Sequence, residues 1–483
     1  MSRDGRHDVL LQIGRGPAAP SPRLGPASEV RVFRSTHGAH LFVADGSRVY
    51  DLPAATADRL DAWLAGGPAP GQAGDQGEDQ ALWDAVGLFT RESAPRIDGR
   101  PLAPPPLASI SLNVMQACNM SCGYCYADEG RFGGRARAMT AEVARATVDR
   151  LITEAAPGAD LVLGYMGGEP LLHRELVHDI TRYAVRAAER AGHRIRFSLT
   201  TNLTTVEPRD AALFEEFPFT VSVSLDGDRE ANDAVRRVRD GSSAYDRVRR
   251  GLEVLAGHGR PRHLSARVTV TSRTGELLPV LEHLIGLGFD EVGFAAVLVS
   301  PDPALAINPA GFPLLLERMV ACGEVALAEL TAGRRYPFGN FETALHQIHR
   351  GSHRPYPCGA GAAYLSANAE GELFACHRLV DDPAFAMGDV ASGPDRAARA
   401  GHLARSHVDR MEPCRDCWAR YLCGGGCYHE VSRRGRVGCD YIRGWLGFCL
   451  RAYVELSASR PAYFDDPGPA GRTSGSDPTT VAR

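Results

Sequence analysis

The sequence predicts an α/β protein whose central part is an open parallel barrel of about six β/α units. From residue 109 to about residue 330, apolar runs of strand length alternate with longer stretches of helical periodicity. A few short strand-like runs precede this region, and a cysteine-dense region follows it. Parallel β/α barrels carry their chemistry at the carboxyl ends of the strands, so we expect functional motifs at that edge.

The length, charge and composition of the chain limit the classes of protein to which it can belong. A chain of 483 residues predicts two to four domains. The net charge of −4 gives no support to a nucleic-acid partner or a membrane surface, and neither is expected. No apolar run approaches the length of a membrane span. The first residues lack the apolar segment of a secretion signal, which predicts a cytoplasmic protein. In that compartment the 12 cysteines are expected to bind metal rather than to form disulfides.

The N-terminal part predicts a disordered lead, residues 1–28, followed by a small module, residues 29–92. Strand-like runs in the module cover residues 29–34, 40–44 and 48–51. Helical periodicity covers residues 56–64 and 81–89. This order suggests a winged-helix-like module similar to the peptide-recognition element in front of many peptide-modifying enzymes, which binds a leader peptide as an added strand. A structural extension without a ligand is the alternative.

The barrel region, residues 107–335, follows a proline-rich linker. Its predicted strands cover residues 109–114, 160–166, 194–200, 219–224, 266–271 and 292–297. Its predicted helices cover residues 141–155, 171–192, 245–257, 276–286 and 312–330. Thr140 has the side chain and the position of an N-cap for the first of these helices.

Three cysteines directly follow the first predicted strand. Cys118, Cys122 and Cys125 are spaced C-x3-C-x2-C. Three thiolates on one tight loop can hold three corners of an iron–sulfur cube, and the fourth iron is then open to a small molecule. A zinc knuckle and buried thiols are the alternatives, although zinc sites usually have paired C-x2-C ligands and need four of them.

This loop resembles that of the radical S-adenosylmethionine (radical SAM) superfamily, with Tyr124 at its aromatic position. The resemblance implies a four-iron, four-sulfur cluster whose open iron binds S-adenosylmethionine (SAM). It also implies that one electron cleaves the sulfonium and releases a 5′-deoxyadenosyl radical.

A second motif, Gly167-Gly168-Glu169-Pro170, follows the next predicted strand. The two glycines would let the backbone approach a ligand, and the carboxylate offers an acceptor to an ammonium group. The motif resembles the GGEP segment of radical SAM enzymes, and the resemblance assigns Glu169 to the amino group of the methionine moiety. By itself the segment is also a plausible turn.

Further motifs end the following strands. Asn202 closes a segment that resembles the family's TN motif, although Leu203 replaces the usual glycine. Ser224 and Asp226 belong to a segment that resembles the family's SLDG motif, and Arg236 ends a D-x-x-R element. These motifs leave two interpretations open for Asn202, Ser224 and Arg236: contact with the cofactor, or a turn or capping role.

The region of residues 350–455 has a second cysteine pattern, which resembles the SPASM extension of radical SAM maturases. Its members are Cys358, Cys376, Cys414, Cys417, Cys423, Cys427 and Cys439. The resemblance implies two auxiliary four-iron clusters, hence three clusters in total. It assigns one cluster to Cys414, Cys417, Cys423 and the last cysteine. It assigns the other to Cys358, Cys376 and Cys427.

Three points about these cysteines stay open. Residues 359–364 contain no cysteine, so the cluster near Cys358 has no evident fourth ligand. Cys439 is favoured as the last ligand over Cys449, which lies in an apolar helical run. A zinc ribbon is the alternative for residues 414–427, but it explains only the C-x2-C pair.

The segments around Asp128, His429 and Cys439 look most like those of maturases of the quinohemoprotein amine dehydrogenase type. That resemblance implies thioether cross-links in a ribosomal peptide or small protein subunit, and a flavodoxin- or ferredoxin-like reductant. Carbon–carbon (cyclophane) cross-linking and formylglycine formation in a sulfatase are alternative activities. An iron–sulfur electron carrier needs no GGEP-like motif and is disfavoured. Asp226 and His429 are candidate bases, although capping or support of a ligand explains each equally well. Residues 456–483 are predicted to be a disordered tail.

Overall fold

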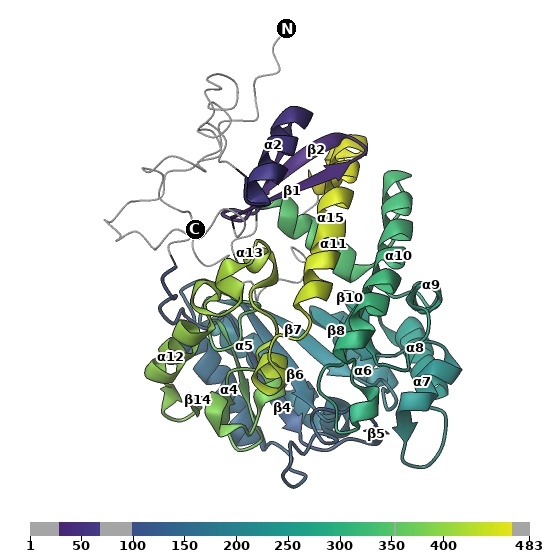
Figure 1. The fold of residues 1–483 in the computed structure, drawn as a ribbon. Helices are drawn as coiled ribbons and strands as arrows, with labels where there is room; N and C mark the ends of the chain where they lie inside the picture. Colours follow the sequence, from purple (N-terminus) through teal and green to yellow (C-terminus); the bar gives the residue numbers. More distant parts are fainter. Residues whose placement is uncertain (1–28, 68–98, 352–353, 466–483) are drawn as a thin grey trace.

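The computed structural model describes residues 29–67, 99–351 and 354–465 (Figure 1). The predicted lead, the predicted helix at residues 81–89 and the end of the predicted tail lie outside these ranges.

A ten-stranded sheet forms the centre of the molecule, in the order β11-β10-β8-β7-β6-β4-β12-β13-β14-β15. Its six parallel barrel strands are β4 (Ser109–Met115), β6 (Asp160–Gly167), β7 (Arg194–Thr201), β8 (Phe219–Ser224), β10 (His263–Val270) and β11 (Glu291–Ala296). Each strand pairs with the next one along the chain, as the predicted β/α units require. Strand β10 begins three residues earlier than its apolar pattern predicts.

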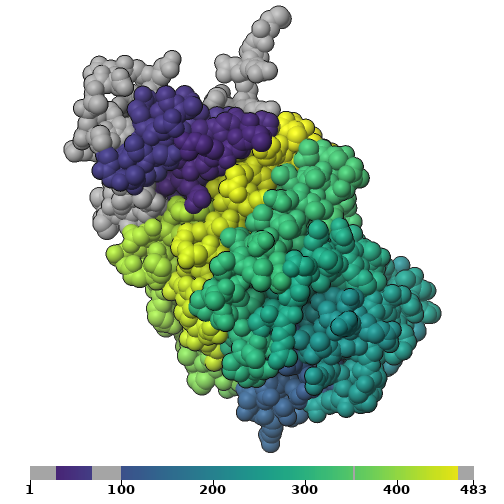
Figure 2. Space-filling view, turned by 45° about the vertical axis from the view of Figure 1, so that its right-hand side comes forward, coloured from purple at the N-terminus to yellow at the C-terminus, as the bar shows by residue number. Residues whose placement is uncertain are grey.

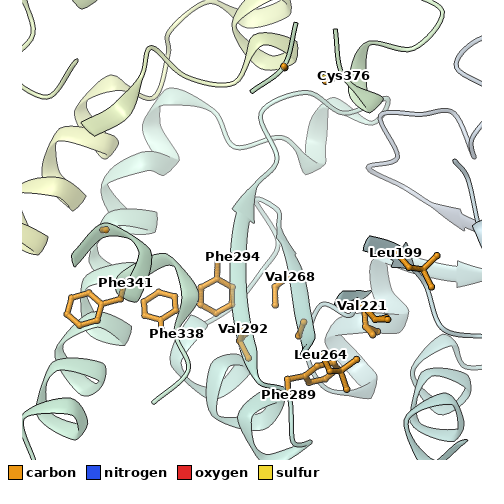
Figure 3. Close-up of a cluster of buried hydrophobic side chains, with 14 of the residues drawn as sticks. Leu199, Val221, Leu264, Val268, Phe289, Val292, Phe294, Phe338, Phe341 and Cys376 are labelled. Carbon is orange, nitrogen blue, oxygen red and sulfur yellow. The ribbon is translucent and has the colours of Figure 1, made fainter. Parts of the chain in front are cut away.

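Helices connect the strands and cover one face of the sheet. They include α4 (Ala141–Glu154), α5 (Arg174–Arg190), α6 (Pro208–Glu216), α8 (Ala244–His258), α9 (Leu277–Gly286) and α10 (Phe312–Thr331). The Thr140 side chain accepts a hydrogen bond from the Val143 N–H, which confirms the predicted N-cap. Apolar side chains of the strands pack under these helices, and Figure 3 shows Val221, Leu264 and Val268 in this buried cluster.

The cysteine-dense region continues the same sheet rather than forming a separate body. Strand β12 (Tyr364–Ala367) lies parallel to β4 on the side away from β6. Antiparallel strands β13 (Glu372–Phe374), β14 (Ala386–Asp389) and β15 (Gly393–Pro394) follow. The region's helices are α12 (Arg396–Ser406), α13 (Arg420–Cys423), α14 (Tyr428–Arg434) and α15 (Cys439–Ser459).

The ordered C-terminal part extends further than predicted. Helix α15 continues to Ser459, and a 3₁₀ turn, η8 (Pro461–Asp465), follows it. Phe464 in this turn is buried and stacks on His349, with ring centroids 4.5 Å apart. Residues 456–465 are therefore packed structure and not part of a disordered tail.

The N-terminal module has the predicted strands and first helix. Strands β1 (Val30–Ser35), β2 (Gly38–Val43) and β3 (Arg48–Leu52) form an antiparallel sheet in that order, and α2 (Ala54–Leu64) follows. The module packs against α15 and the segment around Trp418 (Figure 2). Phe42 meets the Trp418 ring edge-on at 5.6 Å, and Arg420 binds the Glu29 carboxylate at 2.6 Å.

Among the described residues, no helix combines the length and the apolar character needed to cross a membrane.

Candidate active site

The cysteine loop is held against the Gly-Gly-Glu segment by direct backbone contacts. The Gly168 N–H donates to the Met115 carbonyl at 2.8 Å, and the Glu169 N–H donates to the Ala117 carbonyl at 2.9 Å. A Cβ atom added to Gly168 would lie 2.3 Å from the Ala117 oxygen, so only glycine fits there. The predicted close approach at Gly167 and Gly168 therefore exists, but the partner that the structure describes is the loop backbone.

The other side of the loop is held by a short antiparallel pair that the sequence did not predict. Strand β5 (Met120–Cys122) pairs with β9 (Arg236–Val238), and Cys122 lies opposite Arg236 in the register. The Arg236 Nη1 atom lies 4.0 Å from the Cys122 sulfur. The pairing fixes the position of the middle cysteine relative to a buried cation.

The loop thiols lie close together, since Cys122 and Cys125 add to the raised pKa of Cys118, and Cys125 adds to that of Cys122. Burial is the main cause that raises the pKa of Cys118 to about 12 and that of Cys122 to about 11. The Met120 N–H and the Asn202 Nδ2 donate to the Cys118 sulfur at 3.4 Å and 3.7 Å. Thiols in this setting need a metal to deprotonate them, and amide donors around a thiolate suit an iron–sulfur cluster, so the residues fit the implied group.

Glu169 is fully buried beside this loop. Its carboxylate accepts hydrogen bonds from the Thr201 hydroxyl and the Asn202 N–H, both at 2.7 Å, and from the Leu171 N–H at 3.0 Å. Burial raises the pKa of Glu169 to about 7, although these three hydrogen bonds oppose the increase. The side chain thus caps the turn at Pro170 and also holds a carboxylate close to Cys118.

Asn202 links three segments of the site. Its Nδ2 donates to the Asn119 Oδ1 at 2.9 Å, and its Oδ1 accepts from the Thr204 hydroxyl at 2.6 Å. Asn119 in turn donates to the Thr204 hydroxyl at 2.8 Å. Sequence reasoning missed Asn119 and Thr204, because single polar residues in loops give no pattern. Ser224 is half-buried at the end of β8.

Asp226 is the centre of a buried polar group. Its Oδ2 accepts hydrogen bonds from the Arg236 Nε at 2.8 Å and from the Tyr124 hydroxyl, and its Oδ1 accepts from the Thr269 N–H at 2.7 Å. Although burial opposes the charged form, Asp226 and Tyr124 hold the pKa of Arg236 above its ordinary value. Because these three donors already occupy the Asp226 carboxylate, Asp226 is better suited to position Tyr124 and Arg236 than to act as a base.

The C-terminal cysteines fall into two groups according to which thiols influence one another's pKa values. One group contains Cys358, Cys376 and Cys427. The other contains Cys414, Cys417, Cys423 and Cys439. Cys449 is buried in α15, and no other thiol contributes to its raised pKa. Among the described residues, no three His, Cys, Asp or Glu side chains are arranged to hold one metal ion.

Comparison with known proteins identifies the central region. Residues 112–282 match the model of the Radical SAM superfamily. The chain contains a radical SAM domain. Such a domain implies a SAM-binding [4Fe-4S] cluster and SAM.

Curated relatives and solved structures resemble much of the chain. A serine-type anaerobic sulfatase-maturating enzyme of Klebsiella aerogenes is 26% identical over 69% of this chain and 84% of its own. A cysteine-type enzyme of Clostridium perfringens is 27% identical over 73% of this chain and 95% of its own. The structure of native anSMEcpe with bound AdoMet matches with a TM-score of 0.63 at 18% identity, covering 73% of this chain and all of that one. This structural likeness concerns the fold.

A polar group lies between the radical SAM loop and the nearer C-terminal cysteines. The Arg378 guanidinium lies over the Tyr126 ring at 4.8 Å and donates to the Cys427 sulfur at 3.5 Å and to Glu430 at 2.9 Å. Sequence reasoning missed Tyr126, which directly follows one predicted cysteine ligand. It also missed Arg378, which lies two residues beyond another.

His429, the second candidate base, is buried with its ring edge-on to Tyr126, at a centroid distance of 5.5 Å. Burial is the main cause that lowers the pKa of His429 to about 3, and Arg378 and Arg433 add to it. Its imidazole is therefore neutral at neutral pH.

Proposed function

We propose that this protein is a radical SAM enzyme that cross-links a ribosomal peptide or small protein subunit through thioether bonds. The observation that carries the proposal is the arrangement of ten cysteines as one loop of three and two C-terminal groups of three and four, joined by one continuous sheet. A scaffold with several potential cluster sites around one barrel suits oxidation of a bound substrate.

The residues of the radical SAM domain have complementary roles in the proposal. Cys118, Cys122 and Cys125 hold the first cluster, which when bound supplies the electron that cleaves SAM to a 5′-deoxyadenosyl radical. Glu169 accepts a hydrogen bond from the ammonium of SAM. Asn202 positions Cys118.

Four further residues complete the proposed cofactor site. Arg236 and Tyr124, fixed by Asp226, form the opposite wall, and Ser224 faces the cofactor. In this proposal, Gly167 and Gly168 let the backbone of the cysteine loop, rather than the ligand, approach closely.

The C-terminal groups hold the two auxiliary clusters in the same proposal. Cys414, Cys417, Cys423 and Cys439 bind one, since Cys449 lies apart from them. Cys358, Cys376 and Cys427 bind the other. Arg378 donates to the Cys427 sulfur at 3.5 Å.

The N-terminal module is the proposed binding element for a leader peptide. Strand β1 packs against α15, and β2 lies between β1 and β3 in the described sheet. Among the described residues, the outer edge of β3 has no strand partner, and this edge could accept an added strand.

The thioether step balances as follows. A hydrogen atom leaves a substrate carbon and enters 5′-deoxyadenosine. A substrate thiol loses its proton, and its sulfur bonds to the carbon radical. The remaining electron returns to a flavodoxin- or ferredoxin-like carrier that supplies the reductive step.

Formylglycine formation is the second candidate function. It is favoured by the similarity to serine-type and cysteine-type anaerobic sulfatase-maturating enzymes. In that case the substrate would be a Ser or Cys residue of a partner protein.

Mass spectrometry of a peptide treated with the enzyme separates these functions. The reconstituted protein, SAM and reductant are combined with a synthetic peptide that contains Cys and Asp residues. A thioether product loses two hydrogen atoms per link, keeps its sulfur and no longer reacts with iodoacetamide. A formylglycine product reacts with a hydrazide. A cyclophane keeps a free thiol. An unchanged peptide alongside 5′-deoxyadenosine formation would contradict the proposed substrate class.

A further inference from the structure

The face of the barrel sheet away from the outer helices carries small polar side chains. Along β10, Leu264, Ala266 and Val268 are buried in the main core, and Figure 3 shows Leu264 and Val268 there. Successive side chains of a strand point to opposite faces, so the alternate residues lie on the other face. The Ser265 hydroxyl lies 2.9 Å from that of Ser222 on the neighbouring strand. Gly164 lies between Ser111 and Ser198, and a Cβ there would be 3.1 Å from both side chains. We call this polar surface the inner face.

Arg267 is an exception on the inner face. It lies on β10 between Ser265 and Thr269, and it is exposed although its neighbours Ala266 and Val268 are buried. Among the described residues, its guanidinium has no ion pair and no hydrogen bond. The guanidinium is therefore accessible to solvent and available to an anionic ligand.

The neighbouring strand leaves space for this guanidinium. Gly293 lies opposite Arg267 in the register of β10 and β11. A Cβ added to Gly293 would lie 2.7 Å from the Arg267 Nη1, so the guanidinium extends over the glycine. Both neighbours in the register, Ser224 and Gly293, are uncharged.

No carboxylate among the described residues forms an ion pair with Arg267. Across the inner face, His377 belongs to a chain of hydrogen-bonded side chains that begins at Ser111. The His377 Nδ1 lies 3.0 Å from the Tyr364 hydroxyl, which lies 2.8 Å from the Ser111 hydroxyl. The carboxylate on the other side, Asp226, already accepts three hydrogen bonds. Within the described part of the chain, an anion on the inner face would thus meet the unpaired guanidinium of Arg267 and hydroxyl donors.

Arg267 also lies close to the proposed reaction centre. Thr269, two residues further along the same face, donates its N–H to Asp226 at 2.7 Å. Two residues of a strand span about 7 Å. On the opposite side, His377 directly follows Cys376.

We propose that Arg267 determines substrate specificity by binding a carboxylate of the peptide, from an Asp or Glu side chain or from a free C-terminus. A guanidinium matches a carboxylate with two parallel hydrogen bonds. The inference rests on the proposed function and names its substrate class. It places an acidic group of the peptide between the SAM-binding loop and Cys376.

The test uses three labelled probes and measures their dissociation constants by fluorescence anisotropy on the full-length, reconstituted protein. The probes are Ac-Gly-Cys-Gly-Asp-Gly-NH2, its Asn analogue with an amidated C-terminus, and the Asn analogue with a free C-terminus. In the wild type we expect the better of the two acidic probes to bind about tenfold more tightly than the amidated Asn probe. Which acidic probe binds best distinguishes a side-chain carboxylate from a C-terminal one.

Variants then assign the preference to Arg267. Arg267→Gln should reduce the ratio to near one, and Arg267→Lys should restore part of it because it keeps the charge but not the two-pronged geometry. Arg249→Gln, on the outer helix α8, is the matched control and should leave the ratio unchanged. Equal binding of all probes by the wild type, undetectable binding of the acidic probes at millimolar concentration, or a preserved ratio in Arg267→Gln would overturn the proposal.

SAM itself carries a carboxylate, so its binding is measured on the same variants. An unchanged dissociation constant for SAM in Arg267→Gln supports a peptide contact, whereas a weaker one would overturn the proposal. Formation of 5′-deoxyadenosine separates this inference from the function on which it rests. If the wild type cleaves SAM without an acidic preference, only the inference fails. If no variant cleaves SAM, the proposed function fails.

Discussion

Glu169 caps the turn at Pro170 and, in the proposed site, binds the cofactor through the same carboxylate. Its burial raises its pKa to about 7, so the group is half-protonated near neutral pH. The proposed ammonium contact needs the charged form. A carboxyl with a raised pKa gains that form as the pH increases.

We therefore predict that SAM binds more tightly as the pH rises from 6 to 7.5. The change should be several-fold, because the charged fraction of Glu169 grows across its pKa of about 7 while the SAM amino group stays largely protonated. Equilibrium dialysis at a series of pH values measures it. Glu169→Gln should bind SAM weakly and independently of pH. The same pH dependence in that variant would assign it to another group.

Gly168 lies directly against the backbone of the loop that carries the three cysteines. We predict that Gly168→Ala destabilises the protein by roughly 1–3 kcal/mol and lowers its iron content, because the new Cβ would push the Ala117 carbonyl away. Gly257→Ala is the control, since nothing lies within 4 Å of a Cβ there. Denaturant unfolding and iron analysis measure both. A Gly168→Ala variant with a normal iron content would refute the role of Gly168 in positioning the cysteine loop.

The last C-terminal ligand can also be tested one residue at a time. We predict that Cys439→Ser lowers the iron content, because Cys439 lies with Cys414, Cys417 and Cys423. Cys449→Ser should keep its iron, since Cys449 is buried away from these thiols. Iron loss from the Cys449 variant alone would reverse the assignment.

At the scale of elements, the pair β5–β9 and the Asp226 group hold the cysteine loop from one side. Arg236 takes part in both, since it pairs with Cys122 in the register and with Asp226 through its side chain. Loss of the Asp226 charge would leave Arg236 buried without a counter-ion. This is costly, because a broken buried ion pair leaves an uncompensated charge.

We predict that Asp226→Asn destabilises the protein by roughly 3–5 kcal/mol and weakens SAM binding even without peptide. These measurements distinguish a positioning role of Asp226 from the role of a base. A positioning residue affects SAM affinity and the unfolding midpoint, whereas a base acting on the peptide affects only the product. A variant of normal stability that cleaves SAM but forms no cross-link would restore the base assignment.

At the scale of the whole molecule, the barrel was predictable because its strands and helices follow simple periodicities. The six parallel strands and the N-cap at Thr140 follow from local pattern alone. The joining of β12 to β4 was not predictable, since a four-residue strand more than 240 residues away gives no local signal. Strand pairing of this kind depends on tertiary contacts.

The residues of the candidate site likewise divide into those that the sequence predicts and those that it does not. Cysteine spacing and strand-end motifs indicated the loop, Glu169 and Asp226, because residue type and position each limit their chemistry. The partners Asn119, Thr204 and Arg378 were missed, since they act through contacts between distant segments. Arg267 did leave a signal, a charged residue between buried apolar positions of a strand.

The central claim is that the loop of Cys118, Cys122 and Cys125 supports reductive cleavage of SAM. The most direct test measures 5′-deoxyadenosine formed from SAM and dithionite by the anaerobically reconstituted protein, with iron and zinc determined on the same sample. We predict 5′-deoxyadenosine formation by the wild type, ~12 iron per chain for three cubane clusters, and no product from a variant with all three loop cysteines changed to Ala. Negligible iron, or no 5′-deoxyadenosine from iron-loaded wild type, would contradict the account.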